Sequence, residues 1–137
     1  MPHWLFKSEP STWSWADQVV AGAQGTEWTG VRNHTAKQHL QAMQVGDEGF
    51  FYHSGEGKEI VGLVEVSAPY RPDPTDAKGV FGLVELRALR PLPRPVTLAA
   101  VKAEPRLVGM ALVKFSRLSV QPVTQEEWEK VLAMAGP

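Results

Sequence analysis

The amino-acid sequence predicts an α+β domain built on one mixed or antiparallel sheet with short flanking helices. Runs rich in aromatic and β-branched residues are separated by turn residues, a pattern typical of strands joined by hairpins. Short segments with helical spacing of apolar residues lie between these runs, without the regular alternation of strand and helix that marks a parallel sheet. We expect the sheet to close into a small β-barrel. The length of 137 residues fits one domain, over residues 1–137.

The composition is that of a globular protein without disulfides. Hydrophobic residues make up 43% and charged residues 21%, and the absence of cysteine excludes thiol catalysis and cysteine ligands. The net charge of −1 argues against broad charge-driven binding to duplex nucleic acid, but allows one nucleotide to be bound in a local pocket. Neither a signal peptide nor an apolar run of about 18 residues is recognisable, so we expect a cytoplasmic protein with no membrane contact. We also expect a monomer.

Near the beginning of the chain, a strand and a short helix are predicted. The aromatic run over residues 3–7 is typical of a strand. Pro10 ends it, because proline donates no backbone hydrogen bond and restricts the residue before it. Ser14 and Asp17 have the spacing of a capping box and predict a helix that ends near Gly22.

The next segments alternate between loop, helix and strands. We expect a loop over 22–30 and a helix over 33–43, whose apolar residues fall on one face. Aromatic and β-branched runs predict strands over 49–53 and 59–66. The glycine-rich segment 54–58 between them is expected to form a hairpin loop that pairs them in antiparallel fashion.

The second half of the chain is punctuated by prolines. It is predicted to contain, in order, an irregular stretch over 69–79, a strand over 80–89 ended by the prolines between 91 and 95, a short helix over 97–103, and one or two strands over 112–120. Thr124 and Glu127 form a second capping box, which predicts a last helix with one apolar face packed on the sheet.

Catalytic and metal sites find little support in the sequence. His34 and His39 are five residues apart and fall on different helix faces, and no other spacing is typical of metal ligands. The run 55–58 resembles a phosphate-binding loop but lacks its first glycine and its final Ser or Thr. His53 and Ser54 are neighbours on a strand and therefore point to opposite faces. We expect no catalytic residue, no metal and no cofactor.

Aromatic side chains combined with polar ones favour a binding pocket instead. The chain has five Trp, five Phe and two Tyr. In the segment over 28–33, Trp28 offers a flat apolar face, Gly30 a turn, Arg32 a rigid fork of donors and Asn33 a helix cap. Stacking plus hydrogen bonds at the base edge is how flipped or unpaired bases are read. Trp28 is thus either a pocket wall or a core residue.

Several motifs in order resemble the EVE domain family over nearly the whole chain. These motifs are Lys7-Ser8-Glu9-Pro10, Trp28-x-Gly30-Val31-Arg32-Asn33, Phe51-Tyr52-His53-Ser54, Tyr70-x-Pro72-Asp73-Pro74 and Ser116-Arg117-Leu118-Ser119-Val120-Gln121-Pro122. The resemblance implies a PUA-like fold, a small β-barrel with flanking helices related to YTH and ASCH domains. It also implies a function as a reader of modified bases in DNA or RNA.

The resemblance also implies site residues. YTH domains hold a methylated adenine beside a Lys-Ser dipeptide and a tryptophan, and these are matched here by Lys7, Ser8 and Trp28. Glu9 stands where those domains carry an amide, and the second wall of their aromatic cage has no match. The implied ligand-binding residues are Lys7, Ser8, Glu9, Trp28, Thr29, Arg32, Asn33, Tyr52, His53, Ser54, Arg117 and Ser119.

The expected mechanism is stacking of a base on Trp28, with Tyr52 or Trp4 closing another side. Trp28→Ala is expected to abolish binding and to leave the fold intact. The favoured function is a nucleic-acid-binding module for a modified base. The alternatives are an RNA-binding PUA-like domain that recognises shape without such a pocket, and an enzyme that acts on a nucleobase or small amide.

Overall fold

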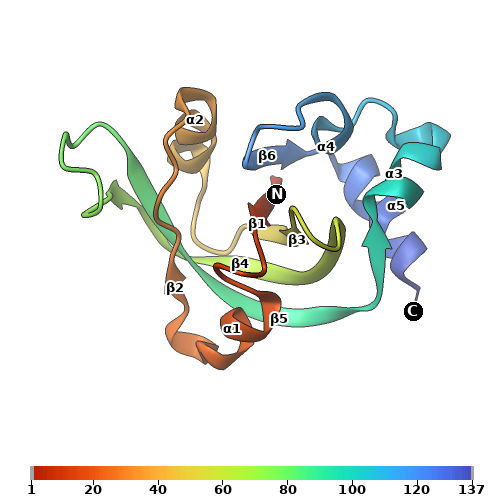
Figure 1. Ribbon diagram of the computed structural model, residues 1–137, viewed down its shortest axis with the longest axis horizontal. Helices are drawn as coiled ribbons and strands as arrows, with labels where there is room; N and C mark the ends of the chain where they lie inside the picture. The colour runs from red at the N-terminus through yellow and green to blue at the C-terminus, as the bar shows by residue number, and fades with distance from the viewer. Residues whose placement is uncertain (1, 137) are drawn as a thin grey trace.

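The computed structural model describes residues 2–136 as one sheet of six strands covered by short helices (Figure 1). The strands are β1 His3–Ser8, β2 Thr26–Glu27, β3 Glu48–His53, β4 Glu59–Pro72, β5 Gly82–Thr97 and β6 Val120–Val123. The helices are α1 Trp15–Val20, α2 His34–Ala42, α3 Leu98–Ala103, α4 Ala111–Lys114 and α5 Gln125–Ala135, with 3-10 turns η1 Gly22–Gln24 and η2 Pro105–Leu107. Within this range, no helix is both long and apolar enough to cross a membrane.

The sheet is mixed and open. Its strand order is β2-β5-β4-β3-β1-β6, with β1 parallel to β3 and the remaining pairs antiparallel. The predicted α+β class is confirmed, but the predicted closure into a barrel is wrong. Over the described residues β2 pairs with β5 and β6 pairs with β1, so these two short strands form the edges. The long β4–β5 hairpin curves under the other strands, but the two edges of the sheet, β2 and β6, do not pair with each other (Figure 1).

The β4–β5 hairpin is longer than the prolines suggested. β5 runs to Thr97 through Pro91, Pro93 and Pro95, where a break was predicted. Proline lacks the N–H that a central strand needs, but an edge strand tolerates it. β2 covers β5 only opposite Glu85 and Leu86, so the second edge of β5 is open at its prolines. For the same reason β4 extends to Pro72, into a stretch predicted to be irregular.

The helix predictions rest on caps that the structure contains. Ser14 and Thr124 both form complete capping boxes, and the Asn33 side chain accepts from the Ala36 N–H at the start of α2. Thr97 likewise caps α3. The prediction for residues 112–120 was wrong, because this segment forms the short helix α4 and a turn before β6.

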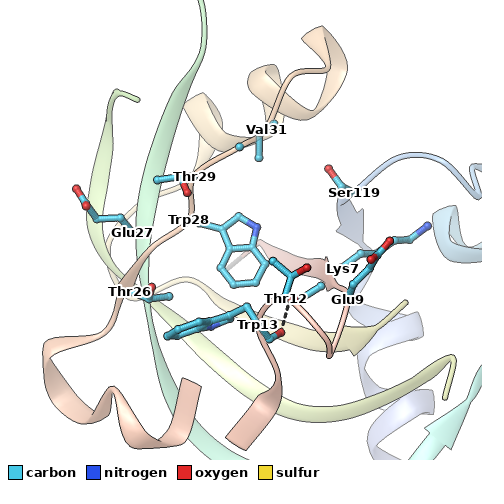
Figure 2. Close-up of a pocket in the computed structure, with 12 residues that line it drawn as sticks. Lys7, Glu9, Thr12, Trp13, Thr26, Glu27, Trp28, Thr29, Val31 and Ser119 are labelled. Carbon is cyan, nitrogen blue, oxygen red and sulfur yellow. Dashed lines mark hydrogen bonds between the residues drawn. The ribbon is translucent and has the colours of Figure 1, made fainter. Parts of the chain in front are cut away.

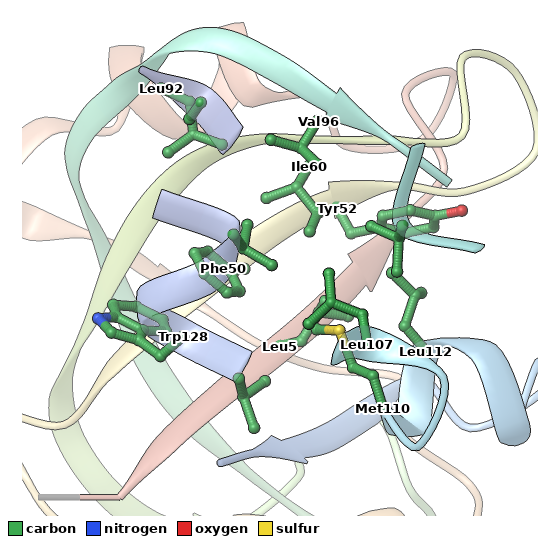
Figure 3. Close-up of a cluster of buried hydrophobic side chains, with 14 of the residues drawn as sticks. Leu5, Phe50, Tyr52, Ile60, Leu92, Val96, Leu107, Met110, Leu112 and Trp128 are labelled. Atoms are coloured by element: carbon green, nitrogen blue, oxygen red, sulfur yellow. The ribbon is translucent and has the colours of Figure 1, made fainter. Parts of the chain in front are cut away.

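Two cores lie on opposite faces of the sheet, as the two-residue period of a strand requires. On β1, Leu5 belongs to one core, whereas Trp4 and Phe6 belong to the other. In the first core, Trp128 of α5 stacks on Phe50 of β3, with ring centroids 4.2 Å apart (Figure 3). The second core contains Trp28, and it lies next to the pocket described below.

One glycine controls the approach of β2 to β5. Gly25 has φ +71, and a Cβ there would lie 2.5 Å from the Leu86 carbonyl oxygen. We expect Gly25→Ala to lower the free energy of unfolding by about 2 kcal/mol, from strain and overpacking together. Gly22→Ala is the matched control, because Gly22 has φ +59 and open space around it. It should cost only about 1 kcal/mol. Urea unfolding measures both, and equal losses would contradict the close approach.

Candidate functional site

A pocket of about 410 Å³ opens beside the second core. Its walls come from the end of β1, the turn after it, β2, the loop after β2 and the residue before β6 (Figure 2). The lining residues are Lys7, Ser8, Glu9, Thr12, Trp13, Thr26, Glu27, Trp28, Thr29, Gly30, Val31 and Ser119. The volume falls in the range of small-ligand sites. The pocket therefore brings together six of the twelve residues implied by the sequence.

Trp28 is at once a core residue and a wall of the pocket. Its ring meets Phe6 and Phe51 edge to face, with centroids 5.7 and 5.8 Å away, and the residue is only 8% exposed. The backbone N–H of Trp28 donates to the Val84 carbonyl at 2.9 Å, which fixes the start of the loop on the sheet. The two interpretations of Trp28 left open by the sequence therefore both hold. Trp28→Ala is therefore expected to reduce the stability of the fold as well as to abolish binding.

Trp13 is the second aromatic residue of the pocket (Figure 2). Its indole N–H donates to Gln18 Oε1 at 2.8 Å, and Gln18 Nε2 donates to the Leu86 carbonyl at 3.0 Å. Gln18 is completely buried, so this chain of hydrogen bonds holds the indole in place. The sequence reasoning missed Trp13. The available signal was its place directly after the turn that follows the Lys-Ser-Glu-Pro motif.

Neither of the residues expected to close the pocket does so. Tyr52 belongs to the first core, on the other face of the sheet. Trp4 is buried in the second core, where its indole N–H donates to Asp47 at 3.1 Å.

A polar side of the pocket is built around the end of β1. The Ser8 hydroxyl donates to the Trp13 carbonyl, and the Glu9 carbonyl accepts from the N–H groups of Thr12 and Trp13. These bonds form the turn that carries both Glu9 and Trp13. The exposed Glu9 carboxylate can accept hydrogen bonds from a ligand, and the Thr12 hydroxyl can donate or accept.

Lys7 connects the pocket to the segment before β6. Its Nζ donates to the Ser116 carbonyl at 2.8 Å and lies 6.0 Å from the centroid of the Tyr52 ring. Its backbone N–H donates to the Ser119 carbonyl at 2.9 Å. Burial lowers the pKa of the Lys7 ammonium group. Lys7 therefore fixes the position of Ser119 at the pocket.

A buried carboxylate anchors the loop that follows Trp28. Asp73 Oδ2 accepts from the Gly30 N–H at 2.9 Å and from Arg32 Nη1 at 3.1 Å, and Oδ1 accepts from both the N–H and the hydroxyl of Thr75. Burial alone would raise the pKa of Asp73, but the bonds from Thr75, Gly30 and Arg32 outweigh it and lower the pKa to about 2. Gly30 adopts φ +83, which suits glycine at this turn.

The other implied residues lie outside the pocket lining. Arg32 is bound to Asp73 and Thr75. Asn33 caps α2.

Three more of the implied residues also lie outside the pocket lining. His53 Nε2 accepts from the Trp15 N–H at 3.0 Å, and burial lowers the pKa of its ring, which favours the neutral form that accepts. The Ser54 N–H donates to the Ser8 carbonyl. Arg117 is exposed on the segment before β6.

The lining residues that were not among the implied ligand-binding residues are Thr12, Trp13, Thr26, Glu27, Gly30 and Val31. Glu27 is held by Arg71, whose Nη2 lies 2.6 Å from Glu27 Oε2. Over residues 2–136, no three His, Asp or Glu side chains gather in a way that could hold a metal ion. The arrangement offers aromatic faces for stacking and polar groups for an edge, which suits a planar polar ligand.

Comparison with known proteins places this chain in a family. The EVE domain model matches residues 2–134. The structure of Rpa0253 from Rhodopseudomonas palustris is 62% identical, with a TM-score of 0.94 over 99% of this chain and 94% of that chain. Human thymocyte nuclear protein 1 is 32% identical over an alignment that covers 96% of this chain and 73% of that protein.

Two of the similar structures contain nucleic acid. The human THYN1 protein in complex with 5-methylcytosine containing DNA has a TM-score of 0.92 and 31% identity, over 100% of this chain and 99% of that chain. The YTH domain of Zygosaccharomyces rouxii MRB1, in complex with N6-methyladenosine RNA, has a TM-score of 0.59 at 16% identity, over 99% of this chain and 85% of that chain, and shows a shared fold alone. Because the EVE domain model matches nearly the whole chain and human thymocyte nuclear protein 1 is 32% identical, the chain belongs to the EVE domain family.

Proposed function

We propose that this protein is a nucleic-acid-binding reader that holds one modified base in the pocket between Trp28 and Trp13. The observation that carries the proposal is the pocket itself, where two fixed indoles meet the polar turn after β1 (Figure 2). A base has a flat face and a polar edge, and this pocket offers a partner for each. The DNA complex of human THYN1, which is 31% identical, supports the same use of the fold here.

In this proposal the base stacks against the indoles and its edge meets Glu9 and the threonines. Stacking contributes roughly 1–3 kcal/mol per base and is tolerant of sequence. Glu9, when ionised, only accepts hydrogen bonds, so it favours a base that presents an exocyclic amine. Thr12, Thr26 and Thr29 carry hydroxyls that can donate or accept.

Binding without turnover fits this site better than catalysis. His53, which pairs with Ser8 of β1, accepts a hydrogen bond from the Trp15 N–H and lies outside the lining. The related human structure is a complex with DNA, which supports a binding module. That the protein acts as a cytoplasmic monomer stays a prediction.

The test is the affinity of Trp13 variants for short single-stranded DNA and RNA oligonucleotides. Each oligonucleotide carries one central base: 5-methylcytosine, N6-methyladenine or an unmodified base. We expect the wild type to prefer one modified base, and Trp13→Ala to weaken that complex roughly tenfold or more through lost stacking. Fluorescence anisotropy of the labelled oligonucleotide measures both.

Trp13→Phe is the matched control, because it keeps an aromatic face at the pocket, although the ring is smaller and the hydrogen bond to Gln18 is lost. It should retain most of the affinity. Equal binding of modified and unmodified oligonucleotides would favour the alternative, a general RNA or DNA binder. No binding to any member of the panel would overturn the proposed function.

A further inference from the structure

We propose that the segment Lys114-Phe115-Ser116-Arg117, called here the 114–117 loop, binds the nucleotide next to the base in the pocket. In this proposal Phe115 stacks on the flanking base of a single strand, and Lys114 and Arg117 contact its phosphates. The inference rests on the proposed function, since it extends the same ligand beyond the pocket.

Phe115 is exposed to solvent, and packing within the domain does not account for an aromatic side chain at this position. It follows α4 directly and is 57% exposed. The other exposed large hydrophobic residues in the described range are all valines: Val19, Val20, Val45, Val80 and Val108. An exposed aromatic ring offers a face for stacking, which an aliphatic side chain does not. Phe115 is therefore the exposed apolar residue whose chemistry points to a planar ligand.

Side-chain hydrogen bonds from β6 and β1 hold the backbone of the 114–117 loop in place. Gln121 is completely buried, and its Nε2 donates to the Phe115 carbonyl at 3.1 Å and to the Leu118 carbonyl at 2.9 Å. The Lys7 ammonium group donates to the Ser116 carbonyl at 2.8 Å. Two side chains from neighbouring strands thus order the backbone that carries Phe115. A loop that is ordered before binding loses less entropy when a ligand arrives.

The loop is continuous with the pocket. Lys7 lines the pocket and holds Ser116, and Ser119 lines the pocket four residues after Phe115. Four extended residues span at most about 14 Å, so Phe115 lies within that distance of the pocket lining. Figure 2 shows Lys7, Glu9 and Ser119 together on the side of the pocket from which this segment leaves.

Local charge favours a polyanion at this loop. Residues 105–125 contain Arg106, Lys114 and Arg117 and no Asp or Glu, in a chain whose net charge is −1. Within residues 2–136 Lys114 and Arg117 form no salt bridge, whereas Arg32 is bound to Asp73. Of the three cations that the family resemblance implies at the site, Lys7 and Arg32 are engaged with protein groups, which leaves Arg117 for a phosphate. The loop supplies the unpaired positive charge that the pocket lacks.

An aromatic ring between two cations matches the chemistry of one nucleotide, a flat base beside its phosphates. A protein partner would be expected to cover a broader apolar patch with several anchors. Phe115 is a single exposed ring with charged neighbours, and this favours single-stranded nucleic acid.

The test compares a ligand that reaches the loop with one that does not. The longer ligand is the oligonucleotide that the wild type prefers in the panel above, and the short one is the corresponding free nucleoside. Phe115→Ala should weaken oligonucleotide binding roughly 5- to 150-fold, as loss of one stacked base predicts, and leave nucleoside binding unchanged. Val108→Ala, at an exposed valine outside the loop, should change neither.

The charges are tested separately by salt dependence. Each phosphate contact to a single strand contributes about −0.7 to the slope of log K against log salt concentration. Lys114→Ala with Arg117→Ala should therefore make the slope for the oligonucleotide shallower by up to about 1.4.

The outcomes separate the two proposals. If the wild type binds the oligonucleotide, and Phe115→Ala weakens binding of the oligonucleotide but not of the nucleoside, the loop is part of the site. If Phe115→Ala changes neither ligand, or weakens both equally, the loop proposal is overturned while the reader function stands. If the wild type binds no oligonucleotide at all, both proposals are overturned.

Discussion

Trp28→Ala is expected to abolish base binding and also to lower the free energy of unfolding by about 3–5 kcal/mol. The stability loss follows because the indole is buried against Phe6 and Phe51 and removing it leaves a cavity in the second core. A domain of this size has only about 5–15 kcal/mol of stability, so the variant should remain folded with a small margin. Urea unfolding measures the first effect, and oligonucleotide anisotropy below the unfolding transition measures the second.

Trp28→Phe is the companion variant for this experiment. It keeps an aromatic ring in the core and at the pocket, so it should lose less stability and retain measurable binding. If the free energy of unfolding of Trp28→Ala lies within about 1 kcal/mol of the wild-type value, the ring contributes little to the stability of the core.

Asp73→Ala is expected to lower the free energy of unfolding by about 3 kcal/mol, because several buried hydrogen bonds to one carboxylate disappear together. Those bonds join the loop after Trp28, at Gly30 and Arg32, to Thr75 in the β4–β5 connection. With the loop released, base binding should weaken about tenfold, since ordering the loop then adds to the cost of binding. Asp73→Asn is the control that keeps the size of the side chain and removes its charge.

The pH dependence of unfolding isolates the charge of Asp73. Its pKa is about 2 in the folded protein against an ordinary value of 3.8, so the carboxylate stabilises the fold above pH 3.8. This contribution, about 2 kcal/mol, is lost as the pH falls from about 4 to 2. Asp73→Asn should therefore show a weaker dependence of stability on pH than the wild type over this interval. Parallel curves for the two proteins would contradict the low pKa.

The local signals in the sequence predicted the elements that carry their own caps. Ser14 with Asp17, Asn33 and Thr124 with Glu127 place three helices, because a cap acts over three residues and can be read from the chain. The path of β5 through its prolines could not be read in this way. It depends on which edge of β5 has a neighbour, and β2, which decides this, consists of only two residues.

The site was predictable where one motif carries it and not where distant residues meet. The motif residues line the pocket as implied: Lys7, Ser8, Glu9 and Trp28. Trp13 is held at the pocket by Gln18, which is itself bound to the Leu86 carbonyl, a group remote in sequence. Alternation on β3 places Phe51 and Tyr52 on opposite faces, but both faces carry a core, so the sequence could not show that Tyr52 faces away from the pocket.

The order of the sheet bears on how the protein is made. β1 lies between β3 and β6, and the bond from Lys7 to Ser116 joins residues 109 positions apart. During synthesis, the first strand therefore waits for one of its two neighbours until almost all of the chain described here has left the ribosome. Contacts of such long sequence separation slow folding, because the chain pays for closing a large loop first. The side of the pocket that holds Ser119 is thus completed late, and a nascent chain gains the whole site only with its last strand.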